Sequence, residues 1–487
     1  MPCSVLRSLL GITIVAVLVS CSPGKSLQRS ARTRVLGTAA LETAHVGISV
    51  FEPATGKYWY DYQGDHYFIP ASNTKIPTCY AAMKYLGDSL AGIRYGFSEP
   101  NKGNESLLVI DPTGDPTFLH PDFKSQRVFS FLQQNFSVAG KRLGWLTNSN
   151  KIEPWGNGWS WNDYEDDYMA ERSVFPVYGN LINVRLLDTS QRRIMSAGDP
   201  ARYGLFSSGI RLFDSLLNNL RPPMYPKLAA IDFPAVKLRR KMESNDFWIE
   251  PGTTPFKSQI IPFATRGFST AAHLLLDTLK ADFTLVDKLP GDGNRYTMET
   301  DNGDVDAIRI PEWKTLYSQP TDSFLRPLMH VSDNFFAEQA LLMTSDKLLG
   351  EMNDGKIVDT LLKTDFRDLP QKPRWVDGSG LSRYNLFSPR DFVMILDRMR
   401  NEFGMERVKT IFPTGGEGTL SSYYKTEAGF LYAKTGTLSG VVALSGFLYT
   451  RKNKLLVFSV LVNNHNHTAT EVRRAVESFL REIRSRY

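Results

Sequence analysis

The stretch around Ser72 constrains the fold most, because a pattern typical of strands gives way there to a helical one. Residues 46–51 and 58–62 have strand character on either side of a turn at 54–56, which predicts a β-hairpin. Residues 76–86 carry a helical pattern. Ser72 is therefore expected where a strand ends and a helix begins.

Ser72 and Lys75 are three residues apart, so on a helix the lysine amine can reach the serine hydroxyl. A serine nucleophile with a lysine base requires this geometry. The lysine must be neutral to accept a proton, and burial and a neighbouring cation both lower its pKa toward that state. The same spacing recurs at residues 22–25 and 422–425, and by itself it is more typical of a helix cap beside a solvated lysine.

The N-terminus reads as an export signal followed by a tether. In residues 1–20, Arg7 precedes an apolar run that is too short to span a bilayer. The run ends in Leu-Val-Ser-Cys, which resembles a bacterial lipobox and predicts that Cys21 is acylated; the alternative is a plain signal peptide with an incidental cysteine. Residues 21–40 are predicted to form a polar tether.

Composition and cysteine usage describe an ordinary folded protein. The chain is 42% hydrophobic and 22% charged, and its 487 residues suffice for two or more cores. Basic and acidic residues are interspersed and leave a net charge of +6, which argues against nucleic-acid binding and fits work beside an anionic polymer. If Cys21 carries lipid, Cys79 is the one free thiol of the mature chain, so no disulfide framework is possible.

After the helix that follows Ser72, the frequency of turn residues and the length of the apolar runs divide the chain into two parts. Residues 91–311 are rich in turn signals and short apolar runs, which predicts an inserted, strand-rich region of one or two subdomains. Residues 41–90 and 312–487 are expected to form one discontinuous domain around it. The last part of the chain is expected to form two strands and a basic amphipathic helix, at residues 441–449, 455–462 and 469–484.

Three short motifs stand in a fixed order along the chain: Ser72-x-x-Lys75, Ser332-Asp333-Asn334 and Lys434-Thr435-Gly436. This trio is the known signature of penicillin-binding proteins and serine β-lactamases. Each motif alone has a structural explanation, as a helix cap or a hairpin corner. Their joint order, with the first opening a helix and the third leading into a strand, favours a catalytic site.

The second and third motifs have chemical roles beside the nucleophile. Lys434 would be the second cation, and Thr435 or Thr437 would hold a substrate carboxylate with it. Gly436 would let a substrate backbone lie against the strand edge. Ser332 would relay a proton to the leaving amine.

Two further groups complete the predicted site. Asn334 would orient the substrate amide and Lys75. The backbone N–H groups of Ser72 and Thr437 would form an oxyanion hole, in which one donor is typically worth about 10²- to 10³-fold in rate.

The flanks of the motifs narrow the resemblance. From about His45 to the C-terminus, the sequence resembles the class C low-molecular-mass penicillin-binding proteins, the D-alanyl-D-alanine carboxypeptidase/endopeptidase family. Besides the long gap between the first two motifs, the resemblance rests on residues 114–116, 332–339, 377–383 and 418–420. Glu417 departs from the family's usual aspartate.

The resemblance implies a transpeptidase-like α/β (α+β) domain, with a central antiparallel sheet flanked by helices and interrupted by the insert. It implies a lipid-anchored, periplasmic serine DD-peptidase that acts on D-Ala-D-Ala in peptidoglycan stem peptides and is acylated by β-lactams. No metal or organic cofactor is implied. Whether such an enzyme trims terminal D-Ala, cuts crosslinks or does both stays open.

Two alternatives remain beside this reading. A serine β-lactamase would need a dedicated deacylating base, and none of the three motifs supplies an obvious glutamate for it. An inactive envelope module that only binds peptidoglycan would keep the fold without the chemistry, and the intact motifs argue against it.

An aromatic stretch in the insert suggests how substrates are chosen. Residues 159–164, followed by Tyr168, resemble a loop that reaches the active site, and short Ser439 leaves room beside it. Asp163 and Arg383 would pair with the ammonium and carboxylate of meso-diaminopimelate in a stem peptide. The alternative is a packed aromatic lid with both charges solvated.

Overall fold

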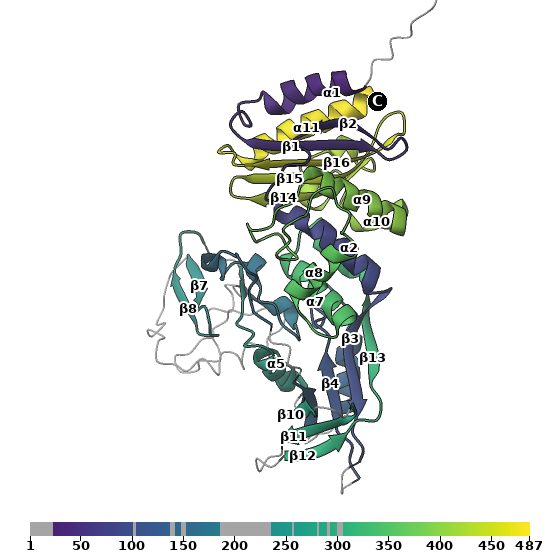
Figure 1. Cartoon of the computed structure of the whole chain (residues 1–487). Helices are drawn as coiled ribbons and strands as arrows, with labels where there is room; N and C mark the ends of the chain where they lie inside the picture. The colour runs from purple at the N-terminus through teal and green to yellow at the C-terminus, as the bar shows by residue number, and fades with distance from the viewer. Residues whose placement is uncertain are drawn as a thin grey trace, which may run out of the picture.

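The computed structural model describes residues 23–100, 104–136, 142–147, 152–185, 235–255, 258–279, 282–289, 293–299 and 305–487. The predicted signal peptide and Cys21 lie outside these residues. The N-terminal and C-terminal parts of the chain together form one domain of sheet and helices. The middle of the chain forms a second sheet, at the opposite end of the molecule (Figure 1).

A five-stranded antiparallel sheet forms the centre of the first domain, in the order β14-β15-β16-β1-β2. Its N-terminal hairpin pairs with the C-terminal strands through β1 and β16. The strands are β1 (His45–Glu52), β2 (Lys57–Tyr62), β14 (Leu431–Leu438), β15 (Val441–Tyr449) and β16 (Leu455–Asn463). Both hairpins predicted from the sequence are confirmed.

Two helical segments from opposite ends of the chain cover one face of this sheet, where Figure 1 shows α1 (Pro23–Ala31) beside α11 (Ala469–Arg486). The prediction of a tether is wrong for residues 23–36. Leu27, Ala31 and Val35, the last from a π-helix at Arg32–Leu36, are buried in one core with α11. These three residues are spaced by four and form an apolar stripe along the helix. The polar residues between them led to the prediction of a tether.

The opposite face of the sheet packs against a helical layer that holds the nucleophile's helix. Residues 75–83 of α2 are all buried, and Cys79 lies among them as core, as predicted. Only the C-terminal end of α2 is accessible, where Lys84 is exposed. The helices are α2 (Lys75–Tyr85), α6 (Thr321–His330), α7 (Asn334–Leu349), α8 (Asp354–Lys363), α9 (Pro389–Phe403) and α10 (Met405–Ile411).

The insert is organised around a seven-stranded mixed sheet in the order β12-β11-β10-β5-β4-β3-β13. Its strands are β3 (Ser89–Phe97), β4 (Leu108–Pro112), β5 (Arg142–Leu146), β10 (Asp282–Lys288), β11 (Arg295–Glu299), β12 (Val305–Arg309) and β13 (Lys314–Pro320). Strand β13 pairs with β3, so the chain leaves and re-enters the first domain through neighbouring strands. The prediction had placed β13 in the first domain.

Smaller elements complete the insert. Helices α3 (Arg127–Phe136) and α5 (Ser269–Leu279) contribute to its core. Two separate antiparallel pairs are β6 (Leu181–Arg185) with β9 (Ser258–Pro262), and the consecutive strands β7 (Val236–Arg240) and β8 (Phe247–Pro251). In the part of the chain that the structure describes, no helix has both the length and the apolar character needed to cross a membrane.

Candidate active site

Ser72 lies on a 3-10 turn, Ala71–Thr74, which leads directly into α2. Ala71 has φ of 47°, a left-handed conformation that costs energy for a residue with a Cβ and often marks a functional turn. Asn73 Nδ2 donates to Ser445 Oγ over 2.7 Å, which ties the turn to β15. The surrounding sheet thus holds the Ser72 hydroxyl in one place, half-buried.

The Lys75 amine is fully buried among three oxygen atoms. Nζ lies 3.1 Å from Ser72 Oγ, 2.6 Å from Asn334 Oδ1 and 2.7 Å from the Ser379 carbonyl oxygen. A neutral amine has two N–H donors and one lone pair. If the donors face Asn334 and Ser379, the lone pair faces the Ser72 hydroxyl, which is the orientation of a general base.

The two lysines of the site have pKa values below their ordinary ones. Burial lowers the pKa of Lys75 to about 8, although the carboxylates of Asp377, Asp333 and Glu338 oppose the shift. Burial, followed by repulsion from Lys75 and Arg473, holds the pKa of Lys434 well below its usual range. The sequence predicted that the charge of Lys434 lowers the pKa of Lys75. Instead, burial is the main cause of the low pKa of Lys75, and repulsion between the two lysines lowers the pKa of Lys434.

The second motif stands at the start of α7 and connects to both lysines. Asp333 caps the helix by accepting from Phe336 N over 2.8 Å, so the next side chain, Asn334, points toward Lys75. Ser332 has φ of 65°, and its hydroxyl accepts from Lys434 Nζ over 2.8 Å. The predicted proton relay is therefore in contact with Lys434.

The third motif lies on edge strand β14, which runs close to the Ser72 turn. A Cβ on Gly436 would stand 2.7 Å from the Pro70 carbonyl oxygen and 3.0 Å from Ser72 N, so only glycine fits without a shift. Thr435 is buried and donates to the Thr419 hydroxyl over 2.8 Å, whereas Thr437 is exposed. The strand thus reaches the Ser72 amide, as the predicted oxyanion hole requires.

The loop at residues 377–383, in which only Arg383 was predicted to have a role, completes the site. The buried Asp377 carboxylate holds this loop together by accepting from five donors: Gly380 N, Ser382 N, Ser379 Oγ, Asn385 Nδ2 and Trp159 Nε1. The gathered loop presents the Ser379 carbonyl oxygen to Lys75. The signal available in the sequence was an aspartate followed by Gly-Ser-Gly, a composition typical of a tight loop organised by a carboxylate.

Glu338, on α7, supports the same loop from behind. Its Oε1 accepts from Ser379 N over 2.7 Å, and its Oε2 lies 3.6 Å from Arg172 Nη1. Burial, with repulsion from Asp377 as the second cause, raises the pKa of Glu338 to about 7. The backbone of one residue, Ser379, therefore connects a buried acid to the buried base.

The insert reaches the second motif through its aromatic loop. The Tyr168 carbonyl oxygen accepts from Asn334 Nδ2 over 3.1 Å. Half-buried Asp163 forms a hydrogen bond with the Tyr168 hydroxyl, which together with burial raises the pKa of that tyrosine. Exposed Arg383 donates to the Ser439 carbonyl oxygen over 2.8 Å, at the turn after β14. Asp163 is thus linked to the second motif only through Tyr168, whereas Arg383 binds the turn after the third motif.

Over the described ranges, no group of three or more His, Cys, Asp or Glu side chains could hold a metal ion.

Comparisons with known proteins show which family the chain belongs to. The model of the D-Ala-D-Ala carboxypeptidase 3 (S13) family matches residues 31–209 and 309–483. A D-alanyl-D-alanine carboxypeptidase of Actinomadura sp. (strain R39) is 26% identical over 459 residues, 89% of this chain and 80% of that protein. The D-alanyl-D-alanine carboxypeptidase DacB of Haemophilus influenzae is 22% identical over 435 residues, 83% of this chain and 82% of its own length.

The fold agrees as well. The crystal structure of penicillin binding protein 4 from Haemophilus influenzae superposes with a TM-score of 0.63 at 18% identity, and the match covers 94% of this chain and 98% of the other. The predicted transpeptidase-like α/β fold is therefore confirmed. The chain belongs to the D-Ala-D-Ala carboxypeptidase 3 (S13) family and is a serine carboxypeptidase of the penicillin-binding protein type.

Proposed function

We propose that the enzyme hydrolyses the D-Ala–D-Ala bond of peptidoglycan stem peptides through an acyl-enzyme on Ser72. The observation that carries the proposal is the Lys75 amine, which is buried, 3.1 Å from Ser72 Oγ, and held by two other acceptors. Such a group is oriented to take the hydroxyl proton, and a pKa of about 8 makes the neutral form available near neutral pH.

The reaction then has two balanced halves. Ser72 Oγ bonds to the carbonyl carbon as its proton passes to Lys75, and the N–H groups of Ser72 and Thr437 hold the oxyanion. The scissile C–N bond breaks when the leaving amine takes a proton, which Lys434 delivers through the Ser332 hydroxyl that it contacts. Water then attacks the ester and gives its proton back to Lys434 through the Ser332 hydroxyl, while Lys75 returns its proton to Ser72 Oγ and the shortened peptide leaves.

The same nucleophile would be acylated by β-lactams. A structure of penicillin binding protein 4 from Haemophilus influenzae is a complex with a novel β-lactam, at a TM-score of 0.60 to this chain. Glu338, the buried glutamate whose charge acts on Lys75, accepts from the Ser379 amide and lies beside Arg172, so it is not directed at an ester on Ser72. This placement favours slow deacylation of a penicillin adduct, which distinguishes a penicillin-binding protein from a β-lactamase.

Mass spectrometry of purified muropeptides after incubation with the enzyme tests the function. Loss of one D-Ala from pentapeptide stems is expected, and cleavage of crosslinked dimers would add endopeptidase activity. A penicillin adduct that turns over rapidly would instead support the β-lactamase, and failure of labelled penicillin to acylate the protein would support the inactive module.

We also propose that Asp163 and Arg383 bind the ammonium and the carboxylate of the diamino acid in the stem peptide. Their places beside Tyr168 and Ser439 support a pocket between the insert loop and the turn after β14. With peptides that differ only in diaminopimelate or lysine at the third position, we expect Asp163→Ala and Arg383→Ala each to lose on the order of tenfold in kcat/KM on the diaminopimelate peptide alone. Equal loss on both peptides, or none, contradicts the pocket and favours an aromatic lid.

We also propose that the enzyme works in the bacterial cell envelope, on the periplasmic side, anchored through lipid on Cys21. Replacing this residue in Cys21→Ser is expected to release the protein from the membrane fraction without loss of peptidase activity. Stable anchoring needs two or more acyl chains, which the basic α11 cannot replace. Fractionation followed by immunoblotting measures the result, and membrane association of the serine variant would indicate a different anchor.

A further inference from the structure

The helical layer formed by the two ends of the chain carries the positive charge of the protein. Residues 23–36, which form α1 and the π-helix, have four basic side chains and no acidic one, and α11 has five arginines and three glutamates. These elements together have a net side-chain charge of +6, which equals the formal net charge of the whole chain. The basic excess of the sequence therefore falls on this layer.

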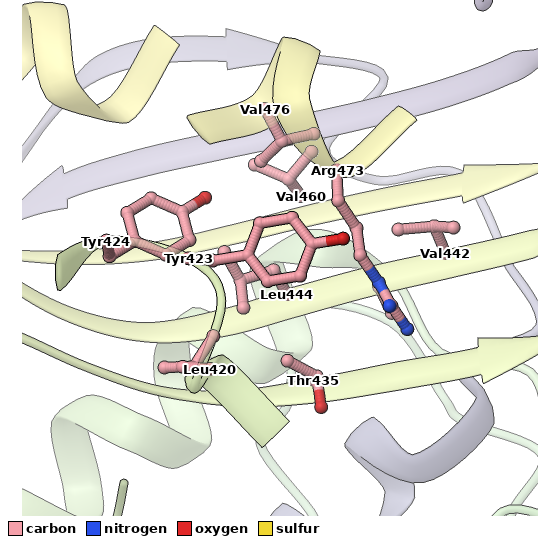
Figure 2. Close-up of a pocket in the computed structure, with 10 residues that line it drawn as sticks. Leu420, Tyr423, Tyr424, Thr435, Val442, Leu444, Val460, Arg473 and Val476 are labelled. Carbon is pink, nitrogen blue, oxygen red and sulfur yellow. The ribbon is translucent and has the colours of Figure 1, made fainter. Parts of the chain in front are cut away.

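Some of these basic residues have partners inside the protein. Arg34 and Arg486 both contact the carboxylate of the buried Glu482. Arg473 extends from α11 toward β14, as Figure 2 shows, and donates to the Thr437 hydroxyl. The charges of these arginines are therefore directed at other parts of the chain.

The outer face of α1 has no such partners. Lys25, Arg29 and Arg32 are exposed, and among the described residues no carboxylate lies within 4.0 Å of their side-chain nitrogens. Their spacing of four and three places them on one side of a helix that turns about 100° per residue, and the buried Leu27 and Ala31 lie on roughly the opposite side. Lys25, Arg29 and Arg32 thus form a basic stripe that points away from the core.

The position of the basic stripe in the chain indicates which partner it meets. Lys25 is four residues after Cys21, the proposed site of lipid attachment. A chain extends at most about 3.6 Å per residue, so the Cα atoms of these two residues lie within about 14 Å of each other. Anionic headgroups attract basic residues near the membrane surface, and each such residue is worth about fivefold in partitioning. A protein held by lipid at Cys21 therefore brings the basic stripe close to these headgroups.

We propose that the basic stripe of α1 docks on the anionic headgroups of the bilayer that holds the lipid anchor, and so orients the enzyme. The inference rests on the proposed anchor at Cys21, because three charges attract too weakly to hold the protein by themselves. The competing explanation is a solvated face that only aids solubility.

Docking through α1 would set the direction of the active site. The five-stranded sheet separates α1 from α2, the helix of Lys75, and the seven-stranded sheet of the insert lies at the opposite end of the molecule (Figure 1). The catalytic layer would therefore lie on the side of the sheet that faces away from the lipid, toward the peptidoglycan.

Co-sedimentation with vesicles tests the docking without the anchor. The protein is the chain from residue 21 onward with Cys21→Ser, and the vesicles contain phosphatidylcholine alone or mixed with anionic phosphatidylglycerol. Combining Lys25→Gln, Arg29→Gln and Arg32→Gln is expected to lower binding to the anionic vesicles on the order of 100-fold, about fivefold for each lost charge. Binding of the parent should also weaken as the salt concentration rises.

Two control variants separate the basic stripe from general effects of charge and folding. Arg29→Lys combined with Arg32→Lys keeps the charge and should bind like the parent. Lys347→Gln, Arg367→Gln and Lys372→Gln together remove three exposed basic side chains from the helical layer across the sheet, and should leave binding nearly unchanged. Circular dichroism checks the fold of each variant.

Energy transfer measures the orientation of the lipidated enzyme on the same vesicles. A dye on Lys363→Cys, exposed on α8 across the sheet from α1, should transfer weakly to acceptors among the headgroups. Cys79 is buried and should not react with the dye. Transfer should increase in the triple glutamine variant of the basic stripe, because only the tether then restrains the molecule.

Several results would contradict the inference. Equal losses in the two triple variants, binding that does not depend on phosphatidylglycerol, or unchanged energy transfer would overturn it in favour of a solvated face. Binding to purified peptidoglycan in place of vesicles, lost in the same variant, would overturn it in favour of a polymer partner. Failure of the proposed anchor is a separate result, in which protein from cells carries an unmodified Cys21 while vesicle binding persists.

Discussion

Ser72→Ala is expected to abolish both covalent labelling by benzylpenicillin and hydrolysis of D-Ala-D-Ala peptides, with kcat reduced by at least about 10⁴-fold. The hydroxyl is the atom that Lys75 approaches, and alanine leaves nothing to acylate. The fold should persist, because the turn is held by Asn73 and Ser445 and by the packing of α2.

Intact-protein mass spectrometry after penicillin treatment, with circular dichroism for the fold, measures this prediction. Ser422→Ala is a matched control, because Ser422 also stands three residues before a lysine but is exposed. It should be labelled at the wild-type rate. Residual labelling of Ser72→Ala at another serine would sink the assignment of the nucleophile.

Lys75→Arg is expected to be nearly as damaging as Lys75→Ala, with acylation slowed by about 10²- to 10⁴-fold, the range of a lost general base. Arginine keeps the positive charge but cannot give up its proton at working pH. Its planar head must also fit the buried space between Asn334 Oδ1 and the Ser379 carbonyl oxygen. Charge alone therefore does not replace the amine.

The pH dependence gives this prediction a second readout. The reactive form of Lys75 is the neutral amine, whose fraction rises with pH through a pKa of about 8. Wild-type acylation should therefore accelerate from pH 6 through pH 8 and level off above about pH 9, and this rise should be absent in Lys75→Arg. Lys425→Arg, from the second Ser-x-x-Lys pattern, is the control. A near-normal rate for Lys75→Arg would show that Lys75 contributes only charge.

The contacts of Lys75 show which parts of the site a local sequence pattern can predict. The contact of Lys75 with Ser72 spans three residues, and a helix brings such a pair together wherever it lies. The contact with the Ser379 carbonyl oxygen spans 304 residues and depends on the loop that Asp377 and Glu338 hold. The sequence marked that loop as unusual but could not say that its backbone faces the lysine.

The N-terminal helix α1 could not be predicted for the same reason, because its packing partner is distant in the sequence. Leu27, Ala31 and Val35 form a stripe that is meaningful only beside α11, more than 400 residues away. Without that partner, the polar composition of the segment favoured a tether. The contact of Arg473 with Thr437 was hidden for a related reason, since a basic residue on an amphipathic helix has the solvated face as its ordinary explanation.

The sequence by itself determined the hairpins, the helix after Ser72, and the order of the three motifs, because side-chain periodicity and short spacings are local properties of the chain. Tertiary structure alone decided which distant groups meet: Ser332 with Lys434, Ser379 with Lys75, and Arg473 with Thr437. It also decided the pKa values of the two lysines, because burial is their main cause and burial exists only once the layers have packed.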